Sequence, residues 1–143
     1  MQRYSAVLTP DPVSGFVVGF PDLPCGITQG ETVEECLDRA ADIVIGVAGE
    51  LLKRREPLPR ARRHRGPRVY AIALPALVEA KLALHETLRQ SGLSKSALGK
   101  RLGAHPMQLD RLFDLRHASR MDQVEAALRA LGKRLVVSVE DAA

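Results

Sequence analysis

The segment from Leu93 to Phe113 constrains the fold of this chain more than any other stretch. Two short helical patterns with apolar stripes flank Gly103, which can adopt the left-handed conformation of a tight turn. Ser94 is placed to cap the first helix through its hydroxyl, and Pro106 suits the first position of the second. Gly99 leaves room for the two helices to cross closely. The pattern predicts a helix-turn-helix, with an ordinary helical hairpin as the alternative.

Basic residues around this motif favour DNA binding over the plain hairpin. The second helix would present a polar face to a major groove. On that face Arg111 could pair with guanine and Gln108 with adenine, whereas Asp110 could accept from cytosine or orient a neighbouring cation. Residues at the start of the first helix and beyond the second would contact the DNA backbone. The candidate DNA-binding residues are Lys95, Ser96, His105, Pro106, Met107, Gln108, Asp110, Arg111, Arg116, His117 and Arg120.

Charge is distributed unevenly along the 143 residues. Residues 1–52 contain two basic and eight acidic side chains, whereas residues 53–143 contain 19 basic and nine acidic ones. The basic part fits phosphate groups, and the acidic part would repel nucleic acid and attract a basic protein. The asymmetry suggests two partners of opposite charge, although segregation that only aids solubility would look the same.

Residues 1–74 predict a small α+β domain. Thr32 and Glu35 have the spacing of a capping box, which opens an amphipathic helix that ends near Arg54. Residues 56–67, rich in proline and arginine, are interpreted as an exposed, solvated linker rather than a specific phosphate contact. Alternating or apolar stretches bounded by turn residues are typical of strands. The expected strands are residues 3–9, 16–20, 27–29 and 68–74, which gives the order βββαβ.

Residues 75–143 predict a second, all-helical domain around the helix-turn-helix. Ser119 and Asp122 are the expected caps of its last helix. Residues 134–139 then alternate like a strand, and a lone strand is not stable in water. This strand therefore either joins the sheet of the first domain or pairs with the same strand of another copy of the chain. We favour pairing between two copies. A twofold dimer would place two recognition helices about 34 Å apart, one turn of DNA.

We expect neither a catalytic site nor a bound metal or cofactor. Cys25 and Cys36 lack metal-ligand spacing and are expected to be reduced, buried thiols. The acidic residues lie in turns or at a helix start, where they need no chemistry to explain them. No apolar run reaches the length of a membrane span, and the start lacks a secretory pattern. We therefore expect a cytoplasmic protein.

Two stretches resemble one known family. Residues 9–40, TPDPVSGFVVGFPDLPCGITQGETVEECLDRA, resemble the amino-terminal domain of HicB-type antitoxins. Residues 87–133, TLRQSGLSKSALGKRLGAHPMQLDRLFDLRHASRMDQVEAALRALGK, resemble the helix-turn-helix of one branch of these antitoxins. A hairpin, a Pro-Asp-Leu-Pro element and a Gly-Glu-Thr helix start occur in the family's order. In this chain Cys25 separates Pro24 from Gly26, whereas proline and glycine are adjacent in the family's pattern.

The resemblance implies a partial ribonuclease H-like first domain and an antitoxin function. Such proteins bind and silence HicA, a small basic ribonuclease toxin that cleaves mRNA, and repress their own operon by binding operator DNA as a dimer. The acidic helix start is the candidate toxin contact. The alternatives are a ligand-sensing helix-turn-helix regulator without a toxin, and an RNA-binding module, which the scarcity of aromatic residues disfavours. The candidate toxin-binding residues are Glu31, Glu34, Glu35 and Asp38.

Overall fold

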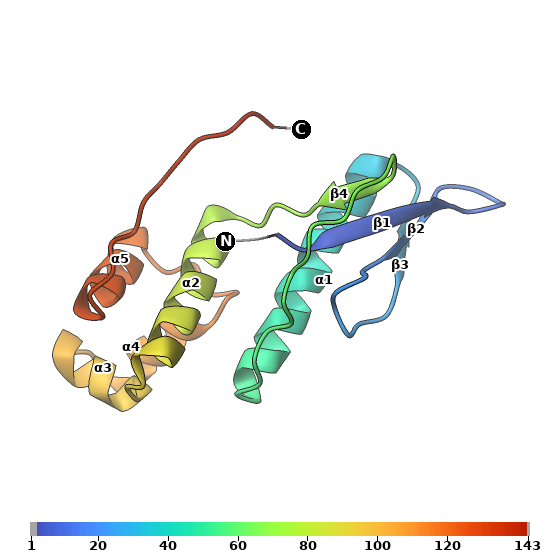
Figure 1. Cartoon of the computed structure of the whole chain (residues 1–143). Helices are drawn as coiled ribbons and strands as arrows, with labels where there is room; N and C mark the ends of the chain where they lie inside the picture. The colour runs from blue at the N-terminus through green and yellow to red at the C-terminus, as the bar shows by residue number, and fades with distance from the viewer. Residues whose placement is uncertain (1–2, 143) are drawn as a thin grey trace. The chain divides into compact units, whose positions relative to one another are not determined.

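The computed structural model describes residues 3–142, which form two compact units that divide after Pro75 (Figure 1). The first unit contains a four-stranded antiparallel sheet and one helix, and the second contains four helices. The chain is therefore of the α+β class, as the sequence predicted.

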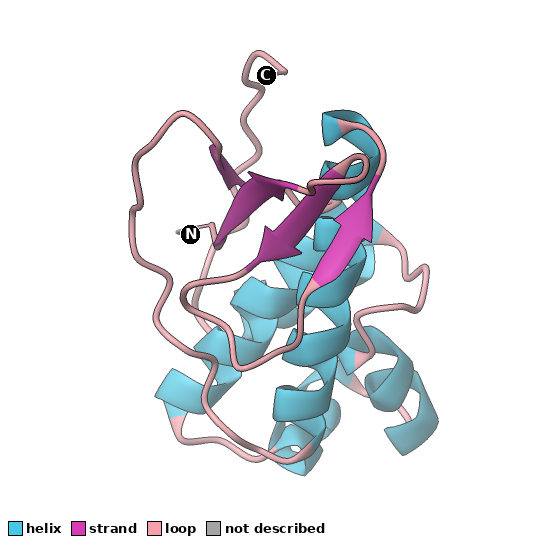
Figure 2. Cartoon of the chain, turned by 90° about the vertical axis from the view of Figure 1, so that its right-hand side faces the viewer, coloured by secondary structure: helices cyan, strands magenta, loops and turns pink. Residues whose placement is uncertain are grey.

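The first unit is a sheet with one helix packed against it (Figure 2). Its strand order is β3-β2-β1-β4, and all neighbouring strands are antiparallel. Period-two alternation places Ala6 and Leu8 of β1 in the core, where they meet Ala40 and Val44 of the helix. The elements are β1 (Ser5–Pro10), β2 (Phe16–Gly19), β3 (Thr28–Gly30), α1 (Val33–Lys53) and β4 (Val69–Ala71).

Helix α1 begins and ends through side-chain and backbone caps. The hydroxyl of Thr32 accepts from the backbone N–H of Glu35 at 3.1 Å, as predicted, while the Glu35 carboxylate accepts from the N–H of Glu31 at 3.0 Å. At the other end Arg55 adopts the left-handed conformation, with φ of 58°. The N–H groups of Arg55 and Glu56 bond the carbonyls of Leu52 and Leu51, an arrangement that more often uses glycine at the left-handed position.

The second unit packs four helices around one apolar core. Its elements are α2 (Ala76–Ser91), α3 (Lys95–Leu102), α4 (Pro106–Phe113) and α5 (Met121–Ala130). Ser94 caps α3 by accepting from the N–H of Ala97 at 3.0 Å, and Gly103 takes a φ of 63° between α3 and α4. A Cβ on Gly99 would lie 2.5 Å from Leu109 Cδ1, so this glycine permits the close crossing. The core side chains are Ala80, Leu84, Leu98, Leu109, Leu112, Phe113, Val124, Ala127 and Leu128.

Two expectations for the second unit differ from the structure. Arg120, not Ser119, is the residue that precedes α5, because the Ser119 hydroxyl is used elsewhere, by Lys81 and His117. Within the described residues, 134–139 form no strand. Leu135 packs against the helical core, whereas Val137 and Val139 are exposed, so a strand here would need a partner that the described part of the chain does not supply.

Candidate functional surfaces

Helix α4 divides into a buried and an exposed face. Leu109, Leu112 and Phe113 lie in the core of the second unit. The opposite face exposes the side chains that the sequence analysis assigned to base contacts, and Met107, an apolar residue, is 65% exposed there. The exposed members of this face are Met107, Gln108, Asp110 and Arg111.

Several of these side chains already have partners in the chain. Lys95 Nζ lies 2.6 Å from Asp110 Oδ1 and 5.4 Å above the Phe113 ring. The Gln108 side-chain oxygen accepts from the N–H of His105 at 2.9 Å, which caps the start of α4. Of the two roles that the sequence left open for Asp110, the structure shows it beside a cation, Lys95. This ion pair is exposed to solvent and is therefore weak.

The loop between α4 and α5 carries the remaining cationic candidates. Arg116 and His117 are exposed, and the N–H of Arg116 donates to Asp114 Oδ1 at 3.0 Å. Arg120 pairs with Asp122 at 2.6 Å. Ser96, His105 and Pro106 are also exposed, at or before the starts of α3 and α4.

A buried lysine holds this loop to the end of α4. The Lys81 side chain is fully buried, and its ammonium donates to the carbonyls of Arg111, Asp114 and His117 at 3.1, 2.7 and 2.7 Å. It also donates to the Ser119 hydroxyl at 2.9 Å. Burial lowers the pKa of Lys81, opposed by the charge of Asp114. Sequence reasoning missed this residue, because a lysine beside an apolar helical stripe usually reads as exposed.

His85, one turn further along α2, bonds the same region. Its Nε2 lies 2.7 Å from the Phe113 carbonyl, and its ring meets the Phe113 ring edge to face at 4.8 Å. Burial lowers the pKa of His85, and the charges of Lys95 and Lys81 lower it further. The hydrogen bond to the Phe113 carbonyl raises the pKa but does not outweigh burial. Two α2 side chains four residues apart thus donate to carbonyls of the last turn of α4, those of Arg111 and Phe113.

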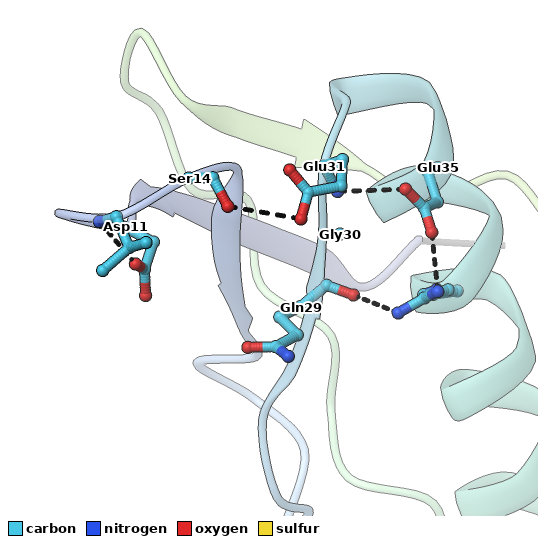
Figure 3. A pocket seen from close by; sticks show the side chains of 8 residues that line it. Asp11, Ser14, Gln29, Gly30, Glu31 and Glu35 are labelled. Carbon is cyan, nitrogen blue, oxygen red and sulfur yellow. Dashed lines mark hydrogen bonds and ion pairs between the residues drawn. The ribbon is translucent and has the colours of Figure 1, made fainter.

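In the first unit, part of the acidic helix start borders a polar pocket of about 390 Å³ (Figure 3). The carboxylate of Glu35 is paired with Arg39 at 2.6 Å, and that guanidinium also donates to the Gln29 carbonyl. The Ser14 hydroxyl donates to Glu31 at 3.3 Å. Glu31 and Glu35 are therefore committed to the local structure around the pocket.

Glu34 and Asp38 face solvent on α1 instead, together with Asp42. These three carboxylates are spaced four residues apart, so they form one stripe along the helix surface. No ion pair within residues 3–142 involves any of them. We call them the acidic stripe. The sequence analysis did not include Asp42, although the spacing of four residues would have found it.

Among the described residues, no three His, Cys, Asp or Glu side chains lie close enough together to hold a metal ion. Cys36 is buried, but Cys25 is only half-buried, and both are free thiols. Burial raises the pKa of both thiols. Among the helices described, none has both the length and the apolar character of a membrane span.

The fold defines a two-unit α+β protein, and comparison with known proteins places it in a family. Residues 3–83 match the description "HicB_like antitoxin of bacterial toxin-antitoxin system". The chain is 36% identical to Antitoxin HicB of Escherichia coli (strain K12), over 93% of this chain and 96% of that protein. It is 40% identical to Antitoxin HicB of Pseudomonas fluorescens (strain Pf0-1), over 85% and 83%. This chain belongs to the HicB-like antitoxin family.

Proposed function

We propose that this protein neutralises a small basic ribonuclease toxin of the HicA type and represses its own operon by binding operator DNA as a dimer. The single observation that carries the proposal is that a HicB-like chain exposes an acidic helix surface in one unit and a polar, arginine-bearing helix face in the other. The first unit exposes the acidic stripe, and the second exposes a helix face with Arg111 and Gln108.

For DNA binding, we propose that α3 and α4 act as a helix-turn-helix. Helix α4 would enter the major groove, because its polar face is exposed while its apolar face is held in the core. Lys95 would leave Asp110 for a phosphate, which frees the Asp110 carboxylate to accept from a cytosine amine. Lys81 and His85 would fix the position of the end of α4 and of the following loop, which contains Arg116, so that both can contact the same duplex.

For dimerisation, we propose that residues 134–139 of two copies pair as strands. Val137 and Val139 are 76% and 96% exposed in the single chain, and their burial between two copies would remove apolar surface from water. Pairing would also satisfy backbone groups that this segment leaves without a ladder.

For toxin binding, we propose that the acidic stripe meets the cationic surface with which the toxin holds RNA. Glu34, Asp38 and Asp42 are exposed and point to one side of a rigid helix, so they present three negative charges in a fixed arrangement. Such complementarity acts mainly on the rate of association. The toxin would then be blocked because RNA and antitoxin compete for the same surface.

We propose no catalytic activity for the first unit, although the family resemblance implies a partial ribonuclease H-like fold for it. A two-metal nuclease site needs convergent carboxylates that are free to bind metal. Glu31 and Glu35 are instead engaged by Ser14 and Arg39. The same internal bonding leaves the pocket few free polar groups for a small ligand, so a ligand-sensing regulator is the weaker candidate.

The DNA part is tested by comparing Arg111→Ala with Lys95→Ala on operator and unrelated duplexes. Loss of Arg111 should cost about 1–3 kcal/mol on the operator alone, whereas loss of Lys95 should weaken both duplexes and reduce the salt dependence. Equal weakening of both duplexes by both variants would contradict these assignments.

The toxin part is tested by charge reversal in the acidic stripe. Asp38→Lys should slow association with the toxin at low salt, while the control Glu56→Lys, which makes the same charge change beyond the C-terminal end of α1, should not. An unchanged association rate for Asp38→Lys would exclude the stripe as the toxin contact.

A further inference from the structure

Residues 54–68, here called the arginine segment, return the chain from the end of α1 to β4 (green in Figure 1). The segment contains Glu56 as its one acid and has no lysine. Every one of its arginines is exposed. Within residues 3–142, no ion pair engages any of these guanidinium groups. The arginines are Arg54, Arg55, Arg60, Arg62, Arg63, Arg65 and Arg68.

The segment is anchored to the first unit, which differs from its interpretation as a solvated linker. Ala61 is 8% exposed, and the Tyr4 hydroxyl donates to the carbonyl of Pro59. Asp22 Oδ2 accepts from the backbone N–H of Arg62 at 2.9 Å and lies 2.9 Å from His64 Nε2. The backbone of the segment is therefore fixed at three neighbouring places, while its guanidinium groups stay in water.

These anchors come from residues that the rest of the fold holds in place. Tyr4 immediately precedes β1, and Asp22 lies in the connection between β2 and β3. The bond from the Arg62 N–H, with a smaller contribution from His64, holds the pKa of Asp22 below its usual value. Asp22 is therefore a carboxylate at neutral pH, and it fixes the backbone around Arg62, while its ion pair is with His64 and not with an arginine.

We propose that the arginine segment is a second nucleic-acid contact, which binds the phosphate backbone of duplex DNA without reading its sequence. This surface lies on the first unit and goes beyond the proposed function, which assigns DNA binding to α3 and α4. A fixed backbone with free guanidinium groups is suited to phosphates, because the planar fork of arginine matches phosphate oxygens and less entropy is lost per bond.

The composition of the segment favours a nucleic acid over an acidic protein. Protein interfaces need an apolar centre, and here the exposed side chains are seven arginines, Glu56 and two prolines, while Leu58 is half-buried. Protein–DNA interfaces are polar and strongly positive, as this surface is. The segment also lacks Phe, Tyr and Trp, the rings on which single-stranded bases stack, so a duplex fits it better than a single strand.

The test measures the salt dependence of binding to an unrelated 30-base-pair duplex with the full chain. In the variant Arg60→Gln, Arg62→Gln, Arg63→Gln and Arg65→Gln, the slope of log K against log salt should fall by about 2 to 4 units, since each phosphate contact contributes about 0.9. The matched control replaces the same four residues by Lys and should keep most of the slope, because it keeps the charge. Circular dichroism should show both variants folded, because Asp22 bonds the backbone of Arg62 and not its side chain.

An unchanged slope in the glutamine variant would overturn the inference, as would tighter binding of the wild-type chain to single-stranded RNA than to the duplex. Failure of this inference is distinguishable from failure of the proposed function. If the wild-type chain binds all duplexes equally and the glutamine variant loses slope, only the proposed operator recognition is refuted. If the glutamine variant keeps both its preference for the operator and its full slope, only the role of the arginine segment is refuted.

Discussion

Replacement of Lys81 by Met should destabilise the second unit by about 3 kcal/mol. The ammonium of Lys81 is fully buried, and its three N–H groups face four acceptors, three carbonyls and one hydroxyl, at 2.7 to 3.1 Å. Methionine keeps the length and apolar stem of the side chain but donates no hydrogen bond. The carbonyls of Arg111, Asp114 and His117 would then lose the charged donor, although each still accepts from a backbone N–H.

The magnitude follows from two opposing effects. A hydrogen bond to a charged group contributes about 1.5–3 kcal/mol, and three such bonds to carbonyls are lost. Removal of a buried ammonium relieves a desolvation penalty of several kcal/mol, which offsets part of that loss. The difference leaves about 3 kcal/mol, which for a unit of this size corresponds to a fall in Tm of roughly 10 °C or more.

Thermal and urea unfolding followed by circular dichroism measure the loss, and amide exchange locates it. Exchange should accelerate in residues 111–119, which Lys81 holds together, more than in α5. Lys100→Met is the matched control, because it makes the same change at an exposed position and should stay within about 0.5 kcal/mol. A Lys81→Met chain as stable as the wild type would refute the reasoning. The hydrogen bonds of the ammonium would then contribute no more than its desolvation penalty costs.

Three further predictions concern stability. Because the pKa of His85 is lowered in the folded chain, the unfolded chain binds a proton at a higher pH than the folded chain does. The free energy of unfolding should therefore fall as the pH drops below 6.5. His85→Gln should flatten this pH dependence, measured by urea titrations between pH 5 and 8. Arg55→Gly should raise the unfolding free energy by up to about 1 kcal/mol, because it removes a left-handed non-glycine residue at the end of α1; a loss of stability would show that φ of 58° carries no strain. Gly99→Val should destabilise by about 1–3 kcal/mol, because a Cβ there would lie 2.5 Å from Leu109 Cδ1, and a neutral effect in the same unfolding assay would mean that α3 and α4 separate freely.

Local signals in the sequence were sufficient for most of the fold. Ser94, Gly103 and Pro106 act through their own backbone and side-chain chemistry, so the ends of α3 and α4 could be predicted from single residues. The alternation in β1 and the spacing in α1 likewise identified the core of the first unit. The third strand lies one residue later than expected, at Thr28–Gly30, because Ile27 is 72% exposed and outside the sheet.

Features that depend on distant residues could not be predicted in this way. The burial of Lys81 requires the end of α4 and the following loop to converge on α2, and no local pattern encodes that convergence. Anchoring of the arginine segment depends on Asp22, which lies 40 residues before Arg62. The partner of residues 134–139 could not be predicted either, because no strand among residues 3–142 is paired with them.

The central claim, that this chain is an antitoxin, is tested most directly by growth. The short basic reading frame expected beside its gene would be induced in a bacterial host with and without this chain, and colony counts compared. The account predicts that the toxin alone arrests growth and that co-expression of this chain restores it. Arrest that persists while the folded chain accumulates in excess of the toxin would contradict the claim.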